Sequence, residues 1–342
     1  MENTCDAAIK PVAVIILNWQ GRELLRRFLP SVVENTDTRI SRVVVADNGS
    51  TDGSLELLEE QFPSVEILKF DRNYGFAEGY NRAVAAIECS YAVLLNSDAA
   101  VTPGWDRALF DYMEAHGDVG ACQPKLMSYD KPSTFEYAGA AGGYLDKNGY
   151  PYCRGRIFGL CETDSGQYDS VADIHWATGA ALMVRRDVYI ACGGLDPKFF
   201  AHMEEIDLCW RIRLAGWRIV AVPSAIVYHL GGGSLPAVNP KKTYLNFRNN
   251  LLMLHKNLPD SVRGGILLRR RLLDTIAWLK YVLTLDFANA RAIFRAHRDF
   301  ASMRKDYTRH PTVNLLGKDR NSRRNILIEY YLKRCCKYSQ LR

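Results

Sequence analysis

Several features are missing from this sequence of 342 residues. Its nine cysteines form no CxxC pair, which argues against a zinc ribbon and favours reduced thiols. No apolar run approaches the roughly 20 residues that cross a bilayer. The polar start leads directly into an expected strand, without the basic segment and small-residue cleavage site of a secretory signal. No internal repeat or low-complexity segment is found. Because the signal sequence and the long apolar run are both missing, we expect a cytoplasmic globular protein that does not span a membrane.

Acidic charge is scarce at one end of the chain. Residues 241–342 contain 23 Lys and Arg against 7 Asp and Glu, whereas residues 1–240 contain 21 against 31. The formal net charge of +6 therefore conceals an acidic body with a basic tail. This asymmetry predicts that the tail meets an anionic surface.

Apolar runs and amphipathic segments alternate over the first hundred residues. This alternation with short connections predicts an α/β fold with a mostly parallel, doubly wound sheet. Strands are expected at 12–17, 42–46, 65–69 and 91–95, and helices at 22–33, 54–61 and 80–88.

The middle of the chain is less regular. Residues 128–172 are rich in Gly, Tyr and Asp, which suits a lid or a pocket wall, although a plain surface insertion is an alternative. Strands are expected again at 181–184 and 218–222, with a helix at 206–215. From residue 241 the pattern becomes helical and basic.

The apolar run at 91–95 stops at Asn96-Ser97-Asp98. A carboxylate at the carboxyl end of a buried strand lies where open α/β sheets place their ligands, and it can hold a divalent cation against a phosphate. The alternative is a polar turn. His229, at the end of a later apolar run, is a candidate second metal ligand, with a core or loop histidine as the alternative.

Polar residues also follow the second and third expected strands. Asp47, before a Gly-Ser turn and a helix, can hydrogen-bond a base or ribose. The helix cap supplied by Thr51 or Asp52 does not explain Asp47. The loop from Asn73 to Asn81 holds two glycines that let the backbone approach a ligand, although a structural turn explains the loop equally well.

A third group of residues combines acids and an aromatic side chain. Glu204, Glu205 and Asp207 fall in the first turn of an expected helix, where the helix dipole and an ion pair from Asp207 to Arg211 offer a structural explanation. Trp176, before Thr178 and Gly179, could stack on a sugar, or it could be a buried residue at the start of a strand. His175 and His202 are expected to be structural.

Four segments carry a resemblance to a known family: ILNWQGRELL, VVVADNGSTDGS, NYGFAEGYN and LLNSDAAVTPGW. In order and spacing they resemble family-2 glycosyltransferases of the GT-A fold, over about residues 10–235. The chain looks most like bacterial rhamnosyltransferase-like members that build cell-surface polysaccharides. We therefore expect a catalytic domain at 1–235, with a nucleotide-binding half at about 10–105 and an acceptor half at 106–235, followed by a helical extension at 236–342.

The resemblance implies roles for individual residues. Asp98, with His229, would hold Mg²⁺ or Mn²⁺, although Asn96 replaces the first acid of the family's Asp-x-Asp motif. Glu205 would deprotonate the acceptor, with Glu204 and Asp207 as reserves, because the family has Glu-Asp where this chain has Glu204-Glu205. The sugar or acceptor would meet Trp176, Thr178 and Gly179, and the nucleotide would meet Leu17, Asn18, Asp47, Asn48, Asn73, Gly75, Phe76, Asn81, Asn96 and Asp98.

These roles imply an inverting, metal-assisted transfer of a sugar from a dTDP- or UDP-linked donor to a glycan or lipid-linked acceptor. The alternatives are an inactive homologue that serves as a scaffold subunit and, less favoured, a sugar nucleotidyltransferase. Arg269-Arg270-Arg271 precede an amphipathic segment that predicts a peripheral contact with the inner membrane leaflet, with a helix packed on the catalytic domain as the alternative. No nucleic-acid-binding signature is present.

Overall fold

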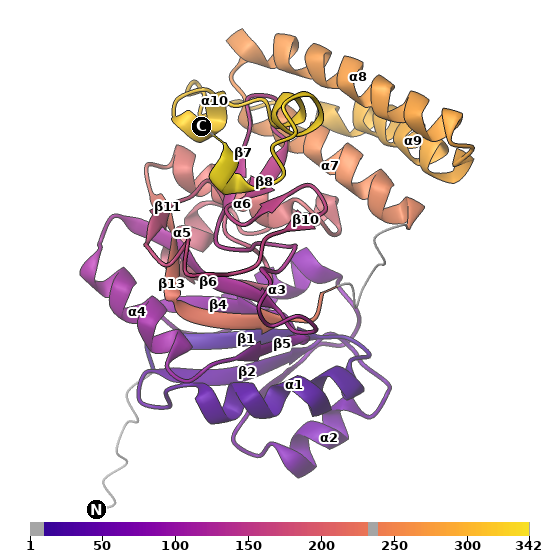
Figure 1. Cartoon of the computed structure of the whole chain (residues 1–342). Helices are drawn as coiled ribbons and strands as arrows, with labels where there is room; N and C mark the ends of the chain where they lie inside the picture. Colours follow the sequence, from indigo (N-terminus) through magenta and orange to yellow (C-terminus); the bar gives the residue numbers. More distant parts are fainter. Residues whose placement is uncertain (1–9, 232–238, 342) are drawn as a thin grey trace, which may run out of the picture.

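The computed structural model describes residues 10–231 and 239–341 of the chain. A nine-stranded mixed sheet forms its centre, in the order β11-β13-β6-β12-β4-β1-β2-β3 with β5 beside β13, and helices cover both faces (Figure 1). The strands of this sheet are β1 (Val12–Asn18), β2 (Ser41–Asp47), β3 (Glu66–Lys69), β4 (Tyr91–Leu95), β5 (Ala99–Val101), β6 (Val119–Ser128), β11 (Ala172–Asp173), β12 (Ala181–Arg185) and β13 (Arg218–His229).

The parallel part of the sheet confirms the expected alternation. β1 pairs in parallel with β2 and β4, and the register places Asn18 opposite Asp47 at their carboxyl ends. Alternate residues of β1 enter two separate hydrophobic cores, one on each face of the sheet. The helices of this half are α1 (Arg22–Asn35), α2 (Ser54–Gln61), α3 (Phe76–Ala86) and α4 (Trp105–Ala115).

Beyond β4 the sheet becomes mixed. β12 runs antiparallel to β4 and β6, while β13 is parallel to β6 and antiparallel to β5. β13 contains 12 residues, because it continues past the expected end at residue 222 to His229. This extension carries His229 to the edge of the sheet where β4 ends.

The segment 128–172 folds into a second, four-stranded sheet in the order β10-β9-β8-β7. Tyr144 and Tyr152 are buried in the main core, so the alternative of a plain surface insertion is wrong for this part. The strands are β7 (Gly143–Leu145), β8 (Pro151–Cys153), β9 (Arg156–Ile157) and β10 (Leu160–Cys161).

The C-terminal helices pack onto the part of the chain that precedes them, since α7 contacts α6 and the loop before it. Figure 1 shows α7 to α9 stacked at the end of the molecule away from α1 and α2. The predicted boundary at 235/236 lies outside the described residues. Residues 1–9, where we expected no secretory signal, also lie outside them. The remaining elements are α5 (Arg186–Ala191), η1 (Pro197–Phe199), α6 (Glu204–Leu214), α7 (Pro240–Asn257), α8 (Asp260–Leu283), α9 (Phe287–Met303), η2 (Arg304–Asp306), α10 (Arg320–Arg323), η3 (Ile328–Leu332) and η4 (Tyr338–Gln340).

Within the described ranges, none of the helices combines the length and the apolar character that crossing a bilayer requires. The amphipathic segment after Arg269 is the second half of α8, and Asp274 within it is buried. Arg270 and His297 lie 3.3 and 3.1 Å from the Asp274 carboxylate. This charged cluster fixes one face of α8 against the rest of the protein and leaves the opposite face exposed.

Candidate active site

The carboxyl ends of β1 and β2 bring Asn18 and Asp47 together. The Asn18 Nδ2 donates to Asp47 Oδ2 at 2.9 Å, and the Ser50 backbone N–H donates to Asp47 Oδ1 at 2.8 Å. Both residues are buried. The turn after β2 therefore fixes the orientation of Asp47, and each carboxylate oxygen keeps a further lone pair that can accept from a ligand.

The loop between β3 and α3 is tied to the end of β2 through Asn48. Its side-chain Nδ2 donates to Asn73 Oδ1 at 3.1 Å, while its Oδ1 accepts from the Tyr74 N–H at 2.9 Å. Gly75 has a φ of 79°, a left-handed conformation that favours glycine. These contacts place Asn73 and Gly75 beside Asn48, and their contact with a nucleotide stays a prediction.

Two glycines bring the helices close to this edge. A Cβ on Gly79 would lie 2.9 Å from Leu17 and 3.2 Å from Asn48, so glycine there lets α3 approach β1 and β2. The Cβ position of Gly179 lies 3.8 Å from the Phe76 ring and 3.7 Å from Glu205. Gly179 thus lies between a predicted nucleotide-binding residue and the predicted base.

Asn81, another predicted nucleotide contact, is engaged elsewhere. Its Oδ1 accepts from the Tyr189 hydroxyl and the Leu195 N–H at 2.7 and 2.9 Å, and its Nδ2 donates to the Leu195 carbonyl at 2.8 Å. The side chain holds α3 against the segment that follows α5. The structure therefore gives Asn81 a scaffold contact, and its nucleotide contact stays a prediction.

Asp98 and His229 meet because β5 pairs with β13. The pairing sets His229 opposite Ala99, the neighbour of Asp98. His229 Nε2 lies 3.0 Å from Asp98 Oδ1 and 3.2 Å from Asn96 Nδ2. The expected pair of metal-binding candidates is thus within contact distance, with Asn96 beside it.

A third acid, Glu136, lies behind the histidine. Its Oε1 is 3.4 Å from His229 Nδ1, on the side of the ring opposite Asp98. Burial disfavours the charged imidazole, but the carboxylates of Asp98 and Glu136 outweigh burial and raise the pKa of His229 to about 10. Sequence reasoning missed Glu136, because the irregular segment that contains it carries no motif around this residue.

The chemistry of these side chains fits a divalent cation that also binds phosphate. One carboxylate and one imidazole nitrogen would be the protein ligands once the cation displaces the proton of His229, and phosphate oxygens and waters would complete the shell. The residues at 10–231 and 239–341 contain no group of three or more His, Cys, Asp or Glu that could hold a metal by itself. A cation at Asp98 and His229 would therefore depend on its substrate for ligands.

Glu204 and Glu205 begin α6, where Glu204 is buried and Glu205 is half-buried. Burial raises the pKa of Glu205 to about 7, although backbone N–H groups at the start of the helix oppose the shift. Burial and then the neighbouring charge of Glu205 raise the pKa of Glu204 well above its usual range. The Oε2 atom of each has no hydrogen-bond partner among the described residues. Near neutral pH, Glu205 is the acid of this pair that can exchange a proton.

Asp207 has a different environment. Arg211 and Lys256 contact its carboxylate at 2.8 and 2.9 Å, and Asn257 donates to it at 2.7 Å. Burial opposes ionisation, but the two cations lower the pKa of Asp207 below its ordinary value. The expected Asp207–Arg211 ion pair is confirmed, and these partners make Asp207 a poor candidate for the reserve base.

The loop before α6 is strained. Phe200, His202 and Met203 all have φ between 67° and 73°, which is costly for residues with side chains. Helix α7 holds the loop in place: Asn249 Nδ2 donates to the His202 carbonyl at 2.7 Å, and Arg248 donates to the Phe199 carbonyl at 2.9 Å. The C-terminal helices are therefore part of the scaffold that positions Glu204 and Glu205.

The predicted sugar contact of Trp176 is not supported, because the indole lies in the core. Trp176 is 2% exposed, its ring packs on Gly143, and its Nε1 donates to the Tyr144 carbonyl at 3.0 Å. Thr178 is also buried, and its Oγ1 accepts from the Ala180 N–H at 3.2 Å. The alternative of a buried Trp at the start of a strand is therefore correct. Of the three predicted sugar contacts, Gly179 is the residue that lies beside Glu205.

The two histidines expected to be structural are buried or half-buried. His175 accepts from the Leu145 N–H at 3.0 Å through Nδ1, and its Nε2 lies 2.9 Å from Asp319. Burial and then the charge of Lys242 lower the pKa of His202 to about 4, so this ring is neutral at pH 7. Neither geometry points to an acid–base role.

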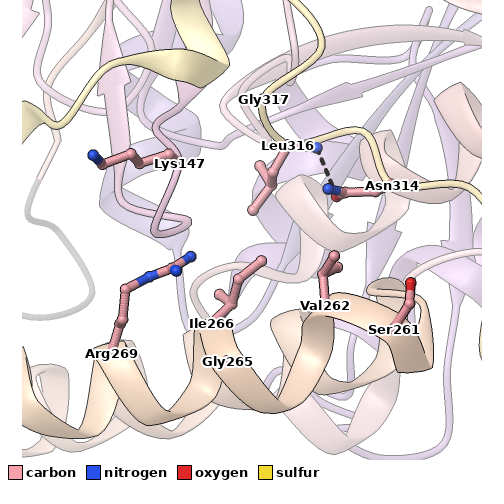
Figure 2. Close-up of a pocket in the computed structure, with 9 residues that line it drawn as sticks. All are labelled: Lys147, Ser261, Val262, Gly265, Ile266, Arg269, Asn314, Leu316 and Gly317. Carbon is pink, nitrogen blue, oxygen red and sulfur yellow. Dashed lines mark hydrogen bonds between the residues drawn. The ribbon is translucent and has the colours of Figure 1, made fainter.

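Two hollows lie away from the sheet edge. Figure 2 shows one of about 340 Å³, in which Lys147 and Arg269 lie on one side and Asn314 and Leu316 across from them. None of its lining residues belongs to α6, α7 or the strained loop. The other hollow, between α7 and α9, includes Phe200 of that loop.

The fold and the site together define a class of protein: an α/β glycosyltransferase of the GT-A fold. The model of Glycosyl transferase family 2 matches residues 13–189, about half of the chain. The chain belongs to that family. Its fold, family and enzymatic class confirm the expectations from the sequence. Glu205 and His229 lie beyond the matched range.

Known proteins agree with this assignment. Over 230 residues the chain is 29% identical to the N-acetylglucosaminyl-diphospho-decaprenol L-rhamnosyltransferase of Mycobacterium tuberculosis (strain CDC 1551 / Oshkosh). The aligned region covers 63% of this chain and 75% of the relative. The fold resembles GalNAc-T7 with UDP, GalNAc and Mn²⁺ (TM-score 0.57, 15% identity, 75% of this chain and 49% of the other). It also resembles a mannosyltransferase of Pyrobaculum calidifontis with GDP-Man and Mn²⁺ (TM-score 0.51, 14% identity, 87% and 85%).

Proposed function

We propose that this enzyme is an inverting, metal-assisted glycosyltransferase that uses a dTDP- or UDP-sugar. The observation that carries the proposal is the position of Glu205. This side chain is half-buried with its Oε2 atom enclosed, is free of cationic partners in the described structure, has its pKa raised to about 7 and lies beside Gly179. A general base works best when its pKa lies near the working pH.

In the proposed reaction the nucleotide lies across the carboxyl ends of β1 to β4. Asp47 and the Asn48–Asn73 contact would orient the nucleoside, and Asp98 and His229 would hold Mg²⁺ or Mn²⁺. When bound, such an ion supplies positive charge that stabilises the leaving diphosphate. Glu205 would take the proton of the acceptor hydroxyl while the oxygen of that hydroxyl attacks the anomeric carbon. A single displacement needs one base, in contrast to the two carboxylates of glycosidases.

The direct test is release of nucleoside diphosphate by the purified protein. We expect release from a dTDP- or UDP-sugar in the presence of a lipid-linked acceptor extract, and loss of that release after chelation with EDTA. GDP-sugars serve as the matched donor control. If no donor gives release under any condition, the protein is instead an inactive homologue, the alternative that the replacement of an acid by Asn96 suggested.

We also propose that the acceptor is carried by a lipid, as the name of the mycobacterial relative states for that enzyme, and that α8 contacts the membrane. Helix α8 presents an exposed apolar stripe at helical spacing: Leu268, Leu272, Ile276, Leu279 and Leu283. Exposed Arg271 flanks the stripe on one side, and exposed Arg269 and Lys280 flank it on the other. An apolar stripe between two rows of cations complements a bilayer with anionic head groups.

Replacing Leu272 and Ile276 together by Asp should weaken binding to phosphatidylglycerol vesicles about tenfold or more, because two inserted side chains are lost. Co-sedimentation with vesicles measures the effect. The matched control places the same change at exposed Leu160 and Ile190, on β10 and α5. Equal binding by both double variants would contradict a membrane contact through α8.

A further inference from the structure

The hollow between α7 and α9, which we call the α7–α9 groove, has a volume of about 550 Å³. Phe200 of the strained loop forms one end of the groove. The rest of the lining comes from the two helices: Pro240, Lys241, Tyr244, Leu245, Arg248, Ala288, Arg291, Ala292 and Arg295.

Three cations of the groove have no anionic partner. Lys241, Arg291 and Arg295 make no side-chain hydrogen bond or ion pair within residues 10–231 and 239–341. Lys241 Nζ lies 4.8 Å from the centre of the Phe200 ring, and Arg295 lies 5.3 Å from that of Tyr244. Three cations in one concavity, none of them hydrogen-bonded or ion-paired to an acid within the described residues, favour an anion with several oxygens.

One acid, Asp299, interacts electrostatically with Arg295, but its carboxylate is already hydrogen-bonded to other groups. Asp299 accepts from the Tyr244 hydroxyl at 2.9 Å and from Arg298 at 3.0 Å. Arg248, the fourth cation of the lining, is largely buried and donates to the Phe199 and Lys198 carbonyls at 2.9 and 3.2 Å. Arg248 therefore fixes the groove to the strained loop, while the other three cations stay available.

The groove is apolar as well as cationic. Leu245, Ala288 and Ala292 line it between the charged residues, and Phe287 and Phe294 are exposed on the same helix as Arg291. Free phosphate or a nucleotide phosphate would gain little from these apolar residues. An anionic group that carries an aliphatic chain would use both kinds of surface.

The position of the groove connects it with the predicted base. Phe200 starts the loop that leads into Glu204 and Glu205, and Lys242, next to Lys241, lies 5.7 Å from the ring of Tyr137, the neighbour of Glu136. A ligand seated in the groove would lie beside the loop that carries the base. The pocket in Figure 2 also holds two cations, but it has no contact with this loop.

We propose that the α7–α9 groove binds the diphosphate of an isoprenoid-linked acceptor, so that its sugar reaches Glu205. This assignment rests on the proposed function, since it names the acceptor class of the same site. Lys241, Arg291 and Arg295 bind the diphosphate, the apolar residues contact the first part of the chain, and the strained loop faces the sugar.

The experiment measures binding to the full-length protein without turnover. Farnesyl diphosphate is the probe, inorganic diphosphate tests for a free anion site, and phosphatidylglycerol vesicles test for a phospholipid head group. Replacing Arg291 and Arg295 together by Gln should weaken farnesyl diphosphate binding about tenfold or more, because two charge-assisted contacts are lost. Arg298→Gln on the same helix is the control and should bind as the unchanged protein does.

Three outcomes would overturn the assignment. The first is equal binding of farnesyl diphosphate by the double variant and the control. The second is binding of inorganic diphosphate as tight as that of farnesyl diphosphate. The third is a double variant that loses binding to the vesicles but keeps its binding of farnesyl diphosphate. All replaced side chains are exposed, so unchanged thermal unfolding should confirm that each variant is folded. Binding of UDP or dTDP with Mn²⁺ is measured separately, so failure of the donor site and failure of the groove are told apart.

Discussion

Glu205→Gln is expected to lower kcat about 10²–10⁴-fold, the usual contribution of a general base. The variant keeps the size of the side chain and removes its ability to accept a proton. In the unchanged enzyme, kcat/KM should rise with pH through about 7, where the buried carboxyl ionises. A donor-turnover assay across pH 5–9 measures both effects.

The same substitution should stabilise the fold at high pH. Since the pKa of Glu205 is raised from 4.5 to about 7, the folded state binds more protons than the unfolded state between these values. The free energy of unfolding therefore falls as pH rises from 4.5 to 7, and the full cost of a buried charge is present above 7. Gln removes that cost, which is on the order of 3 kcal/mol. Urea unfolding should show most of this gain at pH 8 and little of it at pH 5.

Glu204→Gln is the matched comparison. Burial and the neighbouring charge of Glu205 raise the pKa of Glu204 well above its usual range, which favours the neutral carboxylic acid that Gln imitates. Its loss of kcat should be much smaller than that of Glu205→Gln. The opposite ranking would assign the base to Glu204.

Asp98→Ala should abolish detectable binding of Mn²⁺ and lower kcat about 10²–10³-fold, because it removes the carboxylate of a two-residue donor set. Electron paramagnetic resonance of free Mn²⁺ measures binding without turnover. Asp111→Ala, an exposed acid on α4, is the control. Undiminished Mn²⁺ binding by Asp98→Ala would remove the metal from this site.

Glu136→Gln extends this test to the residue behind His229. A carboxylate that accepts from the far nitrogen of a metal-bound histidine fixes its tautomer, and loss of such partners typically weakens metal binding about 10–100-fold. We expect a loss of Mn²⁺ affinity in this range although Glu136 is not itself a proposed ligand. Unchanged affinity would reduce Glu136 to a packing role.

The sequence predicted the elements that local periodicity determines. β1, β2 and β4 are short apolar runs whose residues enter two cores in alternation, and Asp47 and Asp98 follow such runs directly. The ends of parallel strands meet at one edge, so the positions of both acids could be predicted.

Contacts between distant segments could not be predicted in this way. Glu136 reaches His229 only through the pairing of β6 with β13, and Asn249 reaches the strained loop from 47 residues away. For Trp176 the sequence left two roles open, and the packing of its ring on Gly143 decides between them. None of these contacts leaves a periodic pattern near the residue concerned.

Helix α7 links the loop that precedes Glu205 to helix α9. Through Arg248 and Asn249 it holds three left-handed residues ahead of Glu205, and it also packs against α9, next to the proposed membrane helix. If α8 contacts a bilayer as proposed, seating of the helices and the conformation of the loop would be coupled through α7. By thermodynamic reciprocity, a surface that favours one arrangement of α7 favours the matching loop conformation by the same free energy. Glu205 would then be set most firmly in enzyme molecules that are seated on the membrane.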